Sequence, residues 1–155
     1  MNGWLPVIAG TGSIAAGGFY FAFSAVVMPA LRRRPPADAI STMVTINQQA
    51  VRPPFMMLFF GTAAACGAVA VAAASDPANH SPLRVAGAAA YLAGWASTMV
   101  VNVPLNNRLA QRSGGGQPDR HWHSFQRSWI PANHLRAALS MAAAAGLLIP
   151  THPAA

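Results

Sequence analysis

Long apolar stretches separated by short polar segments dominate this chain of 155 residues. Four of them reach about 18 residues or more, the length that an α-helix needs to cross the hydrocarbon core of a bilayer. The first runs from Leu5 to Leu31 without a single charged residue. The pattern predicts an all-α fold, an integral membrane four-helix bundle whose spans cover about residues 5–31, 54–74, 82–105 and 131–149.

Composition favours a single membrane domain over residues 1–155. Hydrophobic residues make up 54% and charged residues 8%, with no lysine at all, whereas a soluble domain has roughly a quarter of its residues charged. The net charge of +7 would suit nucleic acid, but the arginines gather at helix ends and not on one aromatic-rich face. We therefore expect no nucleic-acid partner, and the lipid bilayer as the surroundings of the helices.

The distribution of arginine predicts an orientation in the membrane. Arg32–Arg34 follow the first apolar stretch, whereas the positive region of a cleaved signal peptide precedes its apolar core. The connections after the first and third spans are rich in arginine, while in the second connection Arg84 and Asp76 cancel. By the positive-inside rule, loops 1 and 3 are cytoplasmic and both termini lie outside, in a multi-pass protein of the plasma membrane.

Two of the loops are expected to contain helices of their own. Residues 39–51 place Ile40, Met43 and Val44 near one helical face, and Trp122, Phe125 and Trp129 recur at helical spacing after a glycine-rich turn. These patterns predict short amphipathic or interfacial helices in cytoplasmic loops 1 and 3.

Small residues recur along the spans, where they allow helix backbones to approach closely. Lipid offers no hydrophobic force between helices, so this close packing is what we expect to hold the bundle together. The glycines that occur among the alanines are Gly10, Gly17, Gly18, Gly61, Gly67, Gly87, Gly94 and Gly146.

The densest polar patch within an apolar stretch lies at the end of the third span. Asn102 and Asn106 are four residues apart and share a helix face. Pro104 between them has no N–H and clashes with the preceding turn, which frees the carbonyl of Val100. The pattern predicts a polar notch near the membrane boundary.

A second polar patch begins the fourth span, at a similar depth. If the helix continues through Pro131, then Trp129, Asn133 and Arg136 extend the stripe of Trp122 and Phe125. His134 points away from that stripe. With Asn47 and Gln48 in the first loop, the two patches predict an amide-rich pocket closed by a fixed cation.

Each of these residues also has a structural interpretation. Asn102 and Asn106 are equally typical of hydrogen-bonding groups that join neighbouring helices. Arg136 also fits a cation that reaches the interface, and His134 an interfacial hydrogen-bonding residue. His121 and His123 lie on opposite sides of a helix, and we expect no metal site.

The same residues resemble the anthrone-oxygenase-like family of small four-helix membrane proteins. The resemblance rests on Asn102-x-Pro104-Leu105-Asn106, on the segment containing tryptophan that follows, on Asn133-His134-x-Arg136, and on the early run Gly-Gly-Phe-Tyr-Phe-Ala-Phe. It extends over about residues 8–148. It implies oxidation of a lipophilic phenolic or anthrone-type substrate by molecular oxygen, without a metal or flavin cofactor.

The resemblance also suggests roles for the residues of the two patches. Asn102, Asn106, Asn133 and Arg136 would stabilise an oxyanion, and His134 would be the candidate base. Trp129 would stack on the substrate rings, with Asn47 and Gln48 completing the binding site. The alternative is a non-enzymatic membrane protein, such as an accessory subunit or a small-molecule binder. In that case the same side chains would bond pairwise across helices with no cavity between them.

Overall fold

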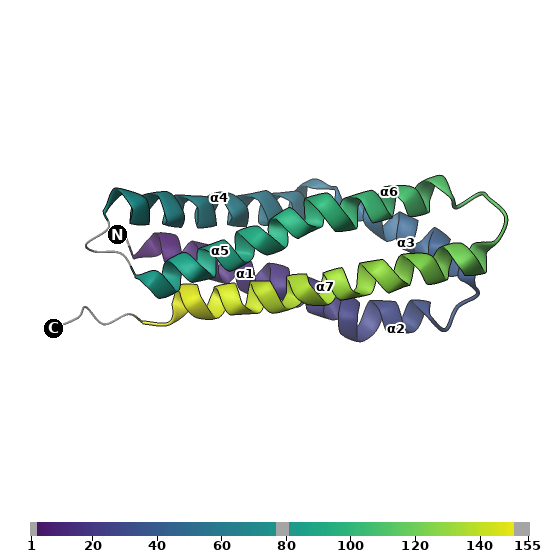
Figure 1. Ribbon diagram of the computed structural model, residues 1–155, viewed down its shortest axis with the longest axis horizontal. Coiled ribbons are helices and arrows are strands. Elements are labelled where there is room, and N and C mark those ends of the chain that lie inside the picture. Colours follow the sequence, from purple (N-terminus) through teal and green to yellow (C-terminus); the bar gives the residue numbers. More distant parts are fainter. Residues whose placement is uncertain (1–2, 77–80, 151–155) are drawn as a thin grey trace.

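The computed structural model describes residues 3–76 and 81–150, and every regular element in these residues is helical (Figure 1). This confirms the predicted all-helical class. In chain order the elements are α1 (Trp4–Ala22), the π-helical turn η1 (Phe23–Val27), α2 (Met28–Leu31), α3 (Pro36–Ala50), α4 (Pro53–Ser75), α5 (Pro82–Ser97), the π-helical turn η2 (Thr98–Asn102), α6 (Val103–Gln111) and α7 (Pro118–Leu148).

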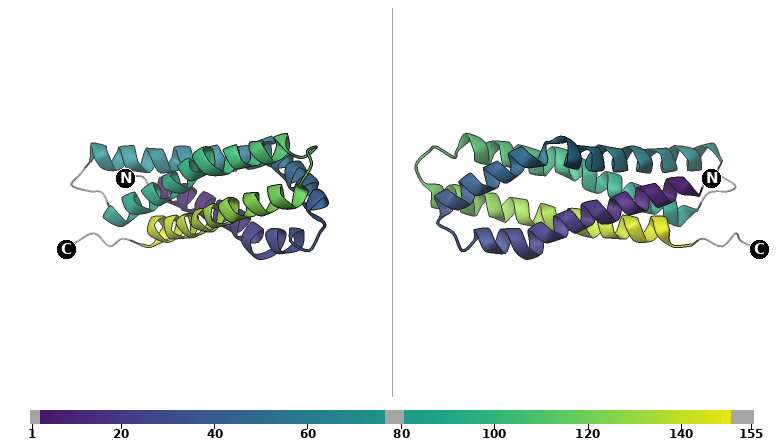
Figure 2. Two further views of the ribbon diagram at one scale, coloured as in Figure 1. Left: turned by 45° about the vertical axis from the view of Figure 1, so that its right-hand side comes forward. Right: turned by 180° about the vertical axis from the view of Figure 1, so that it is seen from behind.

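The long helices lie side by side along one axis (Figures 1 and 2). Helix α7 packs along α1 and α5, and α4 also contacts both of these helices. The short helix α3 contacts α6 and α7. Helix α1 begins and α7 ends at one end of the molecule, while α2, α3, the end of α6 and the start of α7 lie at the other end (Figure 1). This second end carries most of the arginines.

Proline sets where the helices begin. Pro36, Pro53, Pro82 and Pro118 each occupy the first position of a helix, where the missing N–H costs no hydrogen bond and the fixed φ suits the first turn. Gln117 has a φ of 67°, so the chain turns sharply between the glycine-rich loop and α7.

Within residues 3–76 and 81–150, three helical stretches are long and apolar enough to cross a membrane, namely Trp4–Leu31, Pro53–Ser75 and Pro82–Gln111. This supports a membrane protein. Helix α7 is long enough, but polar side chains at Asn133 and Arg136 interrupt its apolar half. The fourth span therefore stays a prediction.

Two boundaries differ from those expected. The third stretch continues as a helix to Gln111, beyond the expected end at residue 105. Helix α7 begins at Pro118 and runs through Pro131 without a break. The residues expected to form a separate interfacial helix in loop 3 are thus the first half of α7, whereas those of loop 1 form the separate helix α3.

Two apolar clusters fill the interior, one toward each end. Near the start of α1 the cluster is built from small and medium side chains, including Ala9, Val69 and Ala143. At the arginine-rich end it is built from large ones, including Met43 and Trp122. The site described below lies between these clusters.

The closest helix approach joins α5 and α7 through two of the predicted glycines. A Cβ atom on Gly146 would lie 2.8 Å from the carbonyl oxygen of Leu83, and one on Gly87 would lie 2.9 Å from that of Ala143. Both contacts are with rigid backbone, so a side chain here forces the helices apart. By contrast, Cβ atoms on Gly18, Gly61 or Gly67 would meet open space. The expected packing role therefore holds for some of these glycines and not for others.

We predict that Gly146→Ala lowers the free energy of unfolding by about 1–3 kcal/mol, the usual cost of overpacking. The matched control is Gly67→Ala, which adds the same methyl group where nothing lies within 4 Å. It is expected to be neutral or slightly stabilising, because alanine favours a helix over glycine. Thermal unfolding in detergent measures both, and equal effects would show that the α5–α7 contact tolerates a side chain.

Candidate functional site

Two π-helical turns and a proline inside a regular helix gather in the middle of the molecule. The π-helical turns Phe23–Val27 and Thr98–Asn102 come directly before Pro29 and Pro104, and Pro131 lies within α7. A proline ring clashes with the carbonyl four residues earlier, and a widened turn relieves that clash. The wide turns change which side chains face inward.

A pocket of about 270 Å³ lies between the helices at this level. Its walls are mainly apolar and aromatic. The ring centroids of Phe19 and Phe55 are 4.3 Å apart, and those of Phe55 and Phe59 are 6.1 Å apart. Its polar lining consists of Tyr20, Asn47, Thr98, Asn106, Trp129 and Arg136.

Arg136 is the one charged side chain that lines this pocket, and it is only 6% exposed. Its Nη2 donates to Asn133 Oδ1 at 2.7 Å, and its Nη1 donates to Thr98 Oγ1 at 3.4 Å. The guanidinium carbon lies 4.4 Å from the ring centroid of Tyr20 and 5.5 Å from that of Trp129. No carboxylate lines the pocket.

Among the described residues, the guanidinium of Arg136 thus contacts only uncharged hydrogen-bond acceptors and aromatic rings. Its Nε atom is buried and has no hydrogen-bond partner within the described part of the chain. A buried charge is costly unless it is paired. The site is therefore suited to a ligand that carries or develops negative charge.

A chain of hydrogen bonds leads from Arg136 to the protein surface. Asn133 Nδ2 donates to the backbone oxygen of Tyr20 and to Ser24 Oγ, both at 2.9 Å. Ser24 Oγ in turn lies 2.8 Å from Nδ1 of His134, which is exposed. Asn133 thereby fixes Arg136 to α1.

The remaining predicted site residues are brought together only in part. Asn106 Oδ1 accepts a hydrogen bond of 2.9 Å from Trp129 Nε1, and both residues line the pocket with Asn47. Gln48 instead lines an adjacent groove of about 210 Å³ that shares Asn47 and Asn106. Asn102 is 1% exposed, but it is not among the pocket residues.

The stripe expected on α7 is confirmed, since Trp122, Phe125, Trp129, Asn133 and Arg136 are all buried. His134 lies off the stripe, as its position in the sequence indicated, and outside the pocket.

Three polar residues of the site were missed. Tyr20 and Thr98 line the pocket, and Ser24 joins Asn133 to His134. The one sequence signal was the spacing of Tyr20 and Ser24, which are four residues apart and share a helix face. Tyr20 and Ser24 each have apolar neighbours, and Thr98 follows Ser97 within an apolar stretch, so no local polar cluster indicates these residues.

No three His, Cys, Asp or Glu side chains gather in residues 3–76 and 81–150. His121 lines a groove with residues of α6, whereas His123 lines another with Arg32. The two histidines therefore face different neighbours.

A family model described as anthrone oxygenase matches residues 55–146, the part of the chain from α4 to α7 that contains Asn106, Trp129, Asn133 and Arg136. No curated protein and no solved structure matches the chain. Since the match covers more than half of the sequence, the chain belongs to the anthrone oxygenase family.

Proposed function

We propose that this protein is a cofactor-independent oxygenase that oxidises a lipophilic phenolic or anthrone-type substrate with molecular oxygen. The observation that carries the proposal is the buried Arg136, a cation without a carboxylate partner in the wall of an aromatic pocket. Such a site favours an enolate over the neutral ketone, because the negative charge that the cation stabilises exists only in the enolate.

The pocket suits a flat, apolar molecule. Its volume of about 270 Å³ is close to the lower limit of roughly 300 Å³ for typical ligand sites. Phe60, Met99 and Val103 at its edge are 47%, 41% and 37% exposed. Apolar side chains at this edge would let a substrate enter from the lipid phase.

The reaction balances with oxygen as the only oxidant. Loss of one proton from the methylene carbon of the anthrone gives an electron-rich enolate, which passes electrons to oxygen and forms a carbon–oxygen bond. The resulting peroxide anion takes up a proton and becomes the neutral hydroperoxide. Loss of the second hydrogen of that carbon, with cleavage of the oxygen–oxygen bond, gives the ketone of the anthraquinone and one molecule of water.

The proposed roles follow from the positions of the side chains. Arg136 stabilises the enolate oxygen, and Asn133 orients Arg136. Trp129 stacks on the substrate, while Asn106 holds the indole by its hydrogen bond. Asn47 completes the wall.

Three further residues act from outside the pocket in this proposal. Asn102 lies at the end of η2 with both polar atoms of its side chain buried and unpartnered in the described residues, and Gln48 borders the adjacent groove. His134 holds Ser24 by a hydrogen bond, and Ser24 accepts one from Asn133. His134 therefore helps to position Asn133 and does not contact the substrate.

We further propose a single-domain four-helix membrane bundle in which α7 supplies the fourth span and α3 lies at the membrane boundary. Most arginines lie at the end formed by α2, α3, the end of α6 and the start of α7 (Figure 1). The positive-inside rule then makes this end cytoplasmic, with both termini outside the plasma membrane.

Oxygen uptake by the purified protein tests the function. With anthrone as substrate, we expect consumption of one oxygen molecule for each quinone formed, well above the spontaneous rate in detergent alone. A chelator should leave the rate unchanged, since no metal takes part in the proposed steps. Heat-treated protein is the control.

The non-enzymatic alternative gives a different result in the same experiment. A binding protein would bind anthrone, seen as quenching of tryptophan fluorescence near Trp129, without faster oxygen uptake. Binding without turnover would therefore contradict the oxygenase proposal. It would leave the pocket as a binding site for small aromatic molecules.

A further inference from the structure

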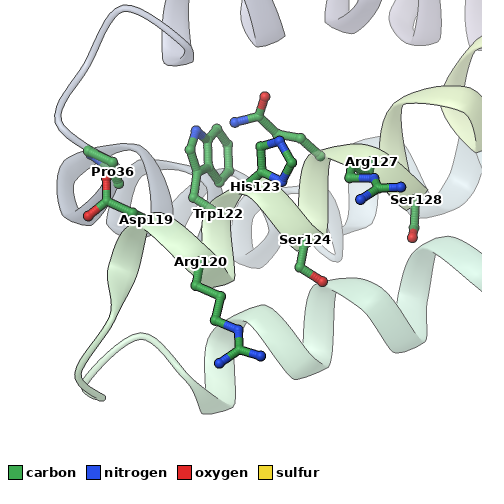
Figure 3. A pocket seen from close by; sticks show the side chains of 9 residues that line it. Pro36, Asp119, Arg120, Trp122, His123, Ser124, Arg127 and Ser128 are labelled. Carbon is green, nitrogen blue, oxygen red and sulfur yellow. The ribbon is translucent and has the colours of Figure 1, made fainter.

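A second cavity lies apart from the pocket, between α6 and the first half of α7. It is a groove of about 210 Å³ with Arg108 of α6 and Arg112, the residue that follows α6, on one side. His121, Ser124 and Ser128 from α7 line the other side. Ser124 and Ser128 also line the neighbouring pocket drawn in Figure 3. That view shows both serines pointing away from the side of α7 that carries Trp122 and His123.

The groove is positively charged and has no internal counterion. No carboxylate lines it. Arg108 and Arg112 are four residues apart at the end of α6, and their like charges repel each other. An anion between them would remove that repulsion.

Hydrogen-bond donors face the same space. The hydroxyl groups of Ser124 and Ser128 are available from α7. The Nδ1 atom of His121 is buried and has no partner in the described residues. Arginine together with hydroxyl donors is the usual chemistry for binding a phosphate group.

The surroundings of the groove indicate a lipid and not a soluble phosphate. Leu105 gives the groove a partly exposed apolar side, with the buried core residues Leu109 and Phe125 behind it, and a small inorganic anion does not need such a side. The groove also lies where the third apolar stretch ends at Gln111. Basic pockets between membrane helices at this level bind the headgroups of anionic lipids.

We propose that this groove binds the phosphate of an anionic glycerophospholipid in the adjoining leaflet. Arg108 and Arg112 contact the phosphate oxygens, Ser124 and Ser128 donate hydrogen bonds to them, and the first part of an acyl chain lies against Leu105 and Leu109. A zwitterionic choline headgroup fits less well, because its ammonium group adds a third positive charge. The proposal does not depend on the oxygenase activity.

Lipid binding to the full chain in detergent tests the proposal. Phosphatidylglycerol and phosphatidylcholine with the same acyl chains are titrated separately, with thermal unfolding and native mass spectrometry as readouts. We expect phosphatidylglycerol to bind more tightly and to raise the unfolding temperature. Equal binding of the two lipids would overturn the proposal. Glycerol phosphate provides the headgroup without chains, and if it binds as tightly as the lipid, the site is one for soluble phosphate and the lipid assignment is wrong.

The double variant Arg108→Gln/Arg112→Gln removes both charges from the groove. We expect it to weaken phosphatidylglycerol binding by about thirtyfold. The control Arg33→Gln/Arg34→Gln removes two exposed charges from the same end of the molecule but outside the groove. It should weaken binding by less than about threefold. An equal loss in both double variants would show that the lipid is attracted by the overall surface charge. It would contradict a specific binding site in the groove.

Discussion

Replacing Arg136 by methionine is expected to lower the rate of anthrone oxidation by about 100-fold or more, the usual effect of removing one oxyanion-stabilising donor. Arg136 is the only charged side chain among the described residues that line the pocket. No other side chain there can balance the negative charge of the enolate with a positive one. Methionine keeps a long, flexible apolar side chain at the position. Steady-state oxygen uptake measures the loss, and Arg120→Met makes the same replacement on an exposed part of α7 as a control.

The same variant is expected to unfold at the same temperature as the natural protein or at a higher one. Losing the guanidinium leaves Asn133 Oδ1 without its donor, at a cost of about 1–3 kcal/mol. It also removes a buried cation whose desolvation costs several kcal/mol.

If Arg136 were only a structural anchor, activity and stability would fall together. Arg136→Lys completes the series. It keeps the charge but not the planar fork that bonds both Asn133 and Thr98, and it should retain part of the activity.

The stripe on α7 could be predicted because the helix is regular there. A period of 3.6 residues places Trp122, Phe125, Trp129, Asn133 and Arg136 on one face. The structure buries all five. The same reasoning placed His134 off the face, and it is exposed.

The partners of that stripe could not be predicted, because η1 and η2 interrupt the regular period. A wide turn shifts the faces of the residues that follow it. Thus Thr98, Met99, Val103 and Asn106 line the pocket, whereas Asn102 does not. Pro104 predicted a disturbance of the helix here, but a proline alone does not distinguish a kink from a π-helical turn.

Tertiary contacts determine the other members of the site. Ser24 bonds Asn133 and His134, which are more than 100 residues away in the sequence. No local pattern indicates such a pair. Of the residues predicted for the pocket, Arg136, Asn106 and Asn47 line it, whereas the contacts that hold them in place could not be read from the sequence.

Replacing Asn133 by aspartate is expected to lower activity about as much as removing the arginine, by about 100-fold. The two side chains have nearly the same shape, so the contact of 2.7 Å to Arg136 would persist, although the hydrogen bond from Nδ2 to the Tyr20 backbone oxygen is lost, as it is with leucine. It would become a buried ion pair. The cation would then already be neutralised, and the enolate would gain little from it.

Asn133→Leu separates charge from geometry. Leucine removes the hydrogen bonds to Arg136, Tyr20 and Ser24 but leaves the cation unpaired, and we expect a loss of only about tenfold from poorer positioning. If the charge of Arg136 drives the reaction, the aspartate variant is the slower of the two. If Asn133 serves only to hold the guanidinium in place, the order is reversed, because aspartate keeps that contact and leucine does not.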